Sequence, residues 1–320
     1  MQRYVVCCVV ILTAEIELAH TLSTQNTLQY GHRFHDNKKL KQGHFEMGIR
    51  YANFMPISNR CARRRAALCP LTKCYTHRRK WLMKLCGIDL AWQGVKNPSG
   101  IAIGELNGNE LRIESVYPCC RDVKAIIDSE PDIVGYAIDA PLIINNISGL
   151  RQCEKELAKV YSSRHASCHP SNLTLYPNPE PVKLAQHLQQ KGVKHLGDRQ
   201  WMLECYPHPT LIEIFSLPER LKYKKGKVVE RRNGQTHLAN LLVSLEFSPI
   251  VKLIIPEHIK HIFSVEYIKS LRGSELKSNE DAIDSVICLY IAALYAVGVT
   301  SKTFGNSIDG YIWIPCSKCV

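Results

Sequence analysis

The chain has 320 residues, of which 45% are hydrophobic and 22% charged, and this composition excludes disordered, fibrous and collagen-like proteins. No apolar run reaches the roughly 18–20 residues that cross a bilayer, so we expect no membrane-spanning helix and no membrane partner. The net charge of +12 is concentrated in residues 1–82, which hold 14 Lys and Arg against 4 Asp and Glu. The overall basic charge is therefore weak evidence that the rest of the chain binds nucleic acid.

Residues 1–82 form a basic N-terminal extension without sustained helical or strand periodicity. The apolar run Tyr4–Leu12 loosely imitates a secretory signal, but Glu15 and Glu17 follow at once. We therefore expect the extension to be disordered or to lie upstream of a true start at Met83, with one organised domain over residues 83–320. The chain's 14 cysteines are scattered as reduced thiols are, and this pattern predicts a cytoplasmic protein.

The organised region predicts strands and helices in a recognisable order. Three strands come first, and the pair Asn107-Gly108 predicts a hairpin between the last two. A helix, an apolar strand, two more helices, a further strand that Pro207 stops and a long last helix follow. The predicted ranges are 85–91, 100–106, 111–116, 121–129, 133–138, 149–161, 182–191, 201–206 and 278–297. This order predicts an α/β protein whose mixed sheet contains an antiparallel trio and parallel strands flanked by helices.

Aspartates occur in or next to three of these elements, at positions where burial of a charge would cost free energy. Asp89 lies in the first strand, Asp139 ends the apolar strand, and Asp281 and Asp284 share one face of the last helix. We expect them to meet, because active sites of open α/β sheets lie at strand carboxyl ends. Buried carboxylates repel one another unless a cation lies between them, and Mg²⁺ and Mn²⁺ prefer such oxygen ligands. The sequence therefore predicts a Mg²⁺ or Mn²⁺ site formed by all four aspartates, with Asp89, Asp139 and Asp284 as the catalytic carboxylates.

Each aspartate also has a structural interpretation. Asp89 could form a buried ion pair, and Asp139 could close a turn through its side chain. Asp281 stands three residues after Ser278, which is the spacing of a capping box. Asp284 lies one turn deeper on an apolar helix, where an unpaired acid is harder to explain.

Four basic or aromatic residues are candidates for substrate contacts. Arg151 opens a helix and could meet a phosphate or pair with Glu154 or Glu156. His208 stands between two prolines, where it could contact a phosphate or orient a water, or simply hold a rigid turn. Lys222 and Lys224 lie in a lysine-rich stretch that would neutralise a polyanion or form a solvated loop.

Five short segments follow one another in the order Gly87–Trp92, Ala137–Leu142, Glu204–Pro209, Lys222–Lys224 and Asp281–Val286. They resemble the Domain of Unknown Function 429 family, which is regarded as a family of RNase H-like nucleases. The resemblance runs from about Lys84 to Pro315. It implies an RNase H-like sheet with carboxylates that match Asp89, Asp139, and Asp281 or Asp284. It also implies that Arg151 corresponds to an arginine of the family, and it leaves Glu130 and Glu204 as candidates for the extra glutamate of RNase H enzymes.

These observations favour a metal-dependent nuclease that hydrolyses phosphodiester bonds of RNA or DNA with Mg²⁺ or Mn²⁺. One alternative is a non-catalytic module that binds nucleic acid or protein through the lysine-rich stretch. The other is an actin-like ATP-dependent kinase, which needs a glycine-rich phosphate loop soon after the first acid. Leu90-Ala91-Trp92 follow Asp89 instead, and this disfavours the kinase.

Overall fold

The computed structural model describes residues 82–93 and 97–316, so the predicted basic extension lies outside the described residues except for Leu82. The strands are β1 (Leu82–Asp89), β2 (Ser99–Asn107), β3 (Glu110–Cys120), β4 (Ile133–Ile138), β5 (Lys194–His195), β6 (Trp201–Glu204), β7 (Lys252–Ile254), β8 (Ser301–Asn306) and β9 (Gly310–Pro315). The helices are α2 (Val123–Ser129), α3 (Gln152–Tyr161), α4 (Glu180–Gln190), α5 (Pro207–Ile214), α6 (Val228–Ser244), α7 (Glu257–Lys260), α8 (Val265–Ser270) and α9 (Gly273–Val297).

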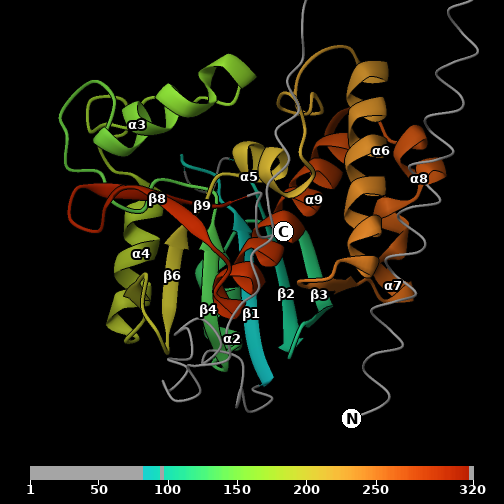
Figure 1. Cartoon of the computed structure of the whole chain (residues 1–320), viewed down its shortest axis with the longest axis horizontal. Helices are drawn as coiled ribbons and strands as arrows, with labels where there is room; N and C mark the ends of the chain where they lie inside the picture. Colours follow the sequence, from blue (N-terminus) through green and yellow to red (C-terminus); the bar gives the residue numbers. More distant parts are fainter. Residues whose placement is uncertain (1–81, 94–96, 317–320) are drawn as a thin grey trace, which may run out of the picture. The chain divides into compact units, whose positions relative to one another are not determined.

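The main sheet has seven strands in the order β5-β6-β4-β1-β2-β3-β7. The predicted trio β1, β2 and β3 is antiparallel, whereas β4 pairs with β1, and β6 with β4, in parallel. Strands β8 and β9 form a separate antiparallel pair. The predicted α/β class with a mixed sheet flanked by helices is therefore confirmed (Figure 1).

Alternation along β1 separates two hydrophobic cores, because successive side chains of a strand point to opposite faces. Leu85 packs in the core that α5, α6, α8 and α9 cover, whereas Cys86 and Ile88 pack in the core that α2 and α4 cover. By the same alternation Asp89 falls on the α9 side of the sheet. The strand pattern thus fixes the face on which the first predicted acid lies.

Two glycines let the backbone of α9 lie directly on β1 and β2. A Cβ atom on Gly87 would lie 2.0 Å from the backbone nitrogen of Leu289, and one on Gly100 would lie 2.1 Å from the backbone oxygen of Asp281. No larger residue fits at either position without moving the helix. Because Gly100 is the strand partner of Asp89, this close approach brings the segment of α9 that carries Asp281 next to the end of β1.

The structure corrects two expectations about helix positions. Helix α9 begins at Gly273 rather than near Ser278, so Asp281 lies two turns inside the helix and its interpretation as a capping residue is wrong. His208 lies in the first turn of α5 and not in a rigid turn, because Pro207 occupies a first helical position, where a missing N–H costs nothing. Within the described part of the chain, no helix is long and apolar enough to cross a membrane.

Candidate active site

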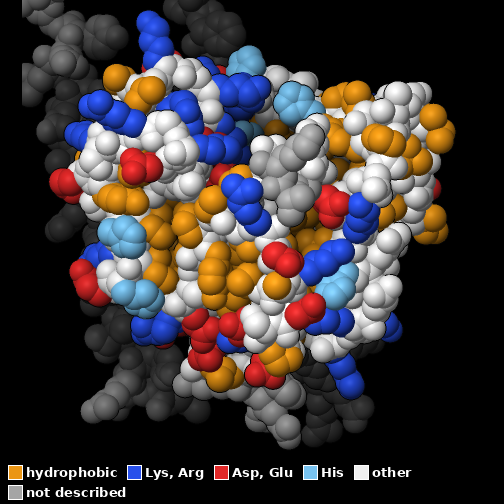
Figure 2. Space-filling model, turned by 180° about the vertical axis from the view of Figure 1, so that it is seen from behind, with side chains coloured by type: hydrophobic (Ala, Val, Ile, Leu, Met, Phe, Trp, Pro, Cys, Tyr) orange, Lys and Arg blue, Asp and Glu red, His pale blue; other side chains and the backbone are white. Residues whose placement is uncertain are grey.

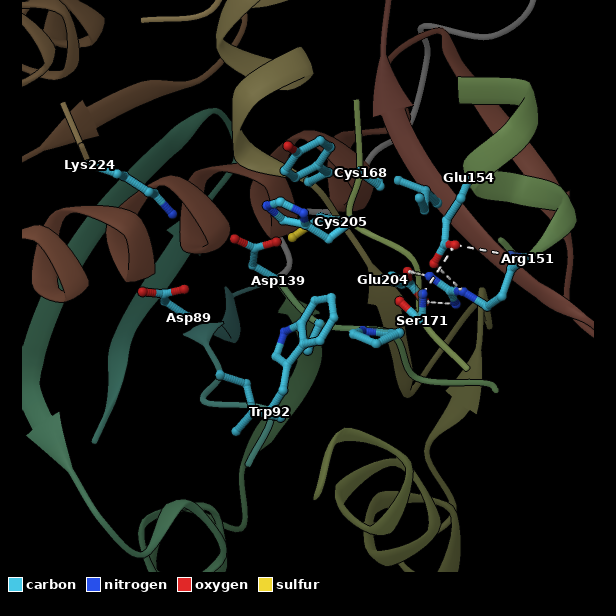
Figure 3. Close-up of a pocket in the computed structure, with 16 residues that line it drawn as sticks. Asp89, Trp92, Asp139, Arg151, Glu154, Cys168, Ser171, Glu204, Cys205 and Lys224 are labelled. Carbon is cyan, nitrogen blue, oxygen red and sulfur yellow. Dashed lines mark hydrogen bonds and ion pairs between the residues drawn. The ribbon is translucent and has the colours of Figure 1, made fainter. Parts of the chain in front are cut away.

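Asp89 and Asp139 stand side by side at the carboxyl ends of two parallel strands. The backbone N–H of Asp139 donates to the carbonyl oxygen of Ile88 over 2.9 Å, which continues the pairing of β4 with β1. Both aspartates are half-buried and line one cavity of about 210 Å³, which we call the aspartate cavity. Figure 3 shows their carboxylates at the same end of the sheet.

Helix α9 supplies the other two predicted acids. Asp281 and Asp284 are buried, with 3% and 0% of their surface exposed. They are three residues apart and therefore share the helix face that lies on the sheet. We call Asp89, Asp139, Asp281 and Asp284 together the acid cluster.

The four carboxylates influence one another electrostatically. Burial raises the pKa of Asp281 to about 8, and the negative charge of Asp89 adds to the increase. Burial likewise raises the pKa of Asp139 and of Asp284, and Asp89 contributes to both. Burial and mutual repulsion therefore disfavour the fully ionised cluster, even though the Nζ atom of Lys277 lies 2.6 Å from Oδ1 of Asp281.

Lys224, in the segment between α5 and α6, supplies a positive charge to this cluster. Its Nζ atom lies 2.8 Å from Oδ2 of Asp284, and Figure 3 shows the amino group pointing toward Asp89 and Asp139. Burial lowers the pKa of Lys224, but the charge of Asp284 and the other nearby acidic groups outweighs it, so the pKa lies well above its ordinary value. Lys224 is therefore a stable ammonium ion at neutral pH.

Tyr223 fixes the second oxygen of Asp284. Its phenolic O–H donates to Oδ1 of Asp284 over 2.7 Å, and both side chains are fully buried. Two consecutive residues, Tyr223 and Lys224, therefore hold one aspartate of α9. The sequence pattern does not indicate this role of Tyr223.

The donor chemistry of the acid cluster suits Mg²⁺ or Mn²⁺, which prefer carboxylate oxygens. The present arrangement is not a ready metal site, because within residues 82–93 and 97–316 no group of three or more His, Cys, Asp and Glu side chains is placed to hold a metal ion. At Asp284 the Lys224 ammonium already makes the contact that a cation would make. Metal binding by the four aspartates stays a prediction, and it requires Lys224 to leave Asp284.

Arg151 and Glu204 form a buried ion pair at the other end of the aspartate cavity (Figure 3). The Nη1 and Nη2 atoms of Arg151 donate to the two carboxylate oxygens of Glu204 over 2.9 and 2.5 Å, and its Nε donates to Glu154 over 2.8 Å. Arg151 is 4% exposed and Glu204 3%. The structure thus gives Arg151 the pairing with Glu154 considered above, and most of its N–H groups are engaged within the protein.

His208 is buried between the rings of Tyr206 and Tyr223, with centroid distances of 5.7 and 5.5 Å. Burial lowers its pKa to about 3, and the charge of Lys224 adds to the decrease. The imidazole is therefore neutral at physiological pH and holds no charge with which to attract a phosphate. His208 packs against Tyr223 and does not line the aspartate cavity.

Lys222 is exposed and its Nζ atom lies 3.0 Å from an oxygen of Glu219. It therefore lies in solvent, unlike Lys224, whose amino group enters the cavity. Figure 2 shows Lys and Arg side chains gathered at one end of the surface. It is the end at which β1, β4 and β6 have their carboxyl ends in Figure 1.

The aspartate cavity also has aromatic residues in its lining that were not among the predicted site residues. Trp92, His169 and Tyr206 line it together with Asp89 and Asp139. A signal existed for Trp92, because it follows Asp89 by three residues at the exit of β1, where side chains of a parallel sheet meet ligands. His169 lies in an irregular segment whose fold the sequence pattern does not indicate.

A mixed sheet with aspartates at the carboxyl ends of β1 and β4 and on the helix laid across them defines an α/β protein whose topology is compatible with an RNase H-like fold. The chain matches the family model described as Protein of unknown function (DUF429) over residues 87–307, and it belongs to this family. The matched range includes the whole acid cluster and Lys224. No curated protein and no solved structure matches the chain.

Proposed function

We propose that this protein is a nuclease that hydrolyses phosphodiester bonds in RNA or DNA with Mg²⁺ or Mn²⁺. The proposal is carried by one observation: carboxylates from β1, β4 and α9 lie at one end of the sheet, where burial and their mutual repulsion raise the pKa of Asp139, Asp281 and Asp284. A divalent ion supplies compensating positive charge, and Lewis-acid catalysis of phosphodiester hydrolysis is its chemistry when bound.

In this proposal the chain's own groups have distinct roles. Asp89 and Asp139 face the cavity and are the first carboxylates that an entering ion meets. Tyr223 keeps Asp284 in one orientation through its hydrogen bond. Lys224 balances the cluster without metal, and when it moves off Asp284 its ammonium group is available to a phosphate at the mouth of the cavity.

A second candidate function is a binding module without catalytic activity. The ion pair between Lys224 and Asp284 favours it, because this pair already satisfies an acid that a metal would otherwise hold. Such a module would bind a polyanion through its exposed basic side chains and would need no divalent ion.

Cleavage assays on the full-length chain separate the two functions. End-labelled single- and double-stranded RNA and DNA are incubated with Mg²⁺, Mn²⁺ or EDTA. We expect metal-dependent cleavage that Asp89→Asn and Asp284→Asn each abolish, and that Asp132→Asn, a change at an exposed aspartate, leaves intact. Binding without cleavage under every condition would reject the nuclease in favour of the module.

A further inference from the structure

We propose that Trp92 stacks on one base of a single-stranded nucleic acid whose phosphodiester lies at the acid cluster. The inference rests on the proposed nuclease function and deepens it, because it specifies the substrate as an unpaired strand. It assigns Trp92 a contact with substrate that neither the sequence motifs nor the family description contains.

Trp92 lies next to the acid cluster. The residue is half-buried and lines the aspartate cavity with Asp89, Asp139 and Lys224. Figure 3 shows its indole extending from the exit of β1 toward Asp139. A large flat apolar ring therefore lies beside carboxylates and an ammonium group in a single cavity.

The indole of Trp92 packs against one neighbouring aromatic ring. Trp92 and Tyr176 form an edge-to-face pair, with ring centroids 5.3 Å apart and an interplanar angle of 69°. In such a pair the rings do not lie face against face. Tyr176 therefore orients the indole without using the parallel stacking that a nucleobase would make.

The aspartate cavity is small. Its volume of about 210 Å³ lies below the roughly 300–1,000 Å³ of pockets that enclose drug-sized ligands. The cavity therefore holds one base or one phosphate rather than two paired strands. Within a duplex the bases are stacked on one another and reach the half-buried indole only after leaving the stack, whereas an unpaired base does so freely.

The combination of groups matches what one nucleotide presents. A phosphodiester carries negative charge, for which Lys224 and a divalent ion in the acid cluster are partners, and its base offers a flat surface. Aromatic side chains in basic surroundings are the usual means by which proteins hold single strands without reading their sequence. We therefore expect weak dependence on base identity and strong dependence on the presence of a base.

Binding measurements in EDTA test the inference independently of catalysis. Fluorescence anisotropy follows binding of the full-length chain to a labelled single-stranded oligonucleotide, to an abasic strand of equal length and charge, and to the duplex. We expect the base-bearing strand to bind most tightly. Trp92→Ala should weaken that binding by about 10-fold or more, while Trp92→Phe retains most of it. Phe247→Ala is the matched control, because Phe247 is 81% exposed.

The abasic strand makes the test specific to stacking. Trp92→Ala should leave its weak binding unchanged, since phosphate contacts do not involve the indole. Equal loss of affinity for base-bearing and abasic strands, or no loss for either in a variant whose urea unfolding matches the wild type, would overturn the inference. If Asp89→Asn abolishes cleavage and Trp92→Ala leaves it unaffected, stacking is rejected and the nuclease is kept. If Trp92→Ala weakens binding but no cleavage is observed, stacking is kept and the nuclease is rejected.

Discussion

The Nζ atom of Lys224 lies 2.8 Å from Oδ2 of Asp284, an aspartate on α9 that has no exposed surface. This ion pair joins the segment before α6 to the helix that crosses the sheet. It also means that the acid cluster contains a cation of its own in the absence of metal. The proposed divalent ion would therefore compete with this ammonium group for Asp284.

Lys224→Met should increase the affinity of the protein for Mn²⁺ by about 10-fold, because the competing charge is removed while the side-chain length is kept. The same change leaves a buried carboxylate without its partner. We expect it to lower the free energy of unfolding in EDTA by about 1–3 kcal/mol, with recovery when Mn²⁺ is added. Electron paramagnetic resonance titration of Mn²⁺ and urea unfolding measure the two effects. Lys225→Met, at an exposed neighbouring position, is the control, and unchanged Mn²⁺ affinity in Lys224→Met would refute the competition.

Tyr223→Phe removes the hydrogen bond that the phenol donates to Asp284 and leaves the ring in place. A hydrogen bond to a buried charged group is worth about 1.5–3 kcal/mol, so we expect a loss of that size in the free energy of unfolding. Urea denaturation measures it. Tyr267→Phe, at an exposed tyrosine, should change stability by less than about 0.5 kcal/mol. Equal stability of the two variants would show that Tyr223 does not stabilise the ionised carboxylate.

The Arg151–Glu204 pair should behave as a buried salt bridge. Arg151→Met leaves Glu204 buried without its partner and should cost about 3–5 kcal/mol. The double variant Arg151→Met, Glu204→Met should recover part of this loss, because no unpaired charge remains. Thermal and urea unfolding of both variants measure the difference. A double variant less stable than Arg151→Met alone would contradict this account.

The lowered pKa of His208 predicts how the free energy of unfolding depends on pH. Because its folded pKa of about 3 lies below its ordinary value of 6.5, the unfolded chain binds more protons between these pH values. Stability therefore falls as pH drops below about 6.5 and continues to fall toward about 3. His208→Phe keeps a ring between Tyr206 and Tyr223 and removes this titration.

The free energy of unfolding of wild type relative to His208→Phe should thus decrease by about 2 kcal/mol between pH of about 6.5 and about 4.5. Urea unfolding of both proteins across this range gives the difference, and carboxylates common to both cancel. A difference that stays constant with pH would mean that folding does not change the pKa of His208.

Much of the sheet was predictable, because its strands carry local signals. The Asn107-Gly108 hairpin and the apolar run that ends before Asp139 place the trio and β4, and strand polarity then puts Asp89 and Asp139 at one edge. The predicted start of α9 was wrong by five residues. The residues from Gly273 onward are mostly polar, and the helix becomes continuously buried only in its later turns, so its first turns show no apolar periodicity.

Contacts between distant segments were not predictable from local patterns. Lys224 reaches Asp284 from a segment without periodicity, and Arg151 pairs with Glu204 across 53 positions of sequence. Strands β7, β8 and β9 are short or closed by turns, and the sequence pattern assigned none of them. These features depend on how elements pack, which a single sequence does not encode in its spacing.

The central claim is that aspartates of β1, β4 and α9 form one site for a divalent ion. The most direct measurement is an electron paramagnetic resonance titration of Mn²⁺ into the full-length wild type, Asp89→Asn, Asp139→Asn and Asp132→Asn. The account predicts one bound ion in the wild type and in Asp132→Asn, and affinity at least about 10-fold weaker in the other two. A wild type that binds no Mn²⁺, or equal binding by all four proteins, would contradict it.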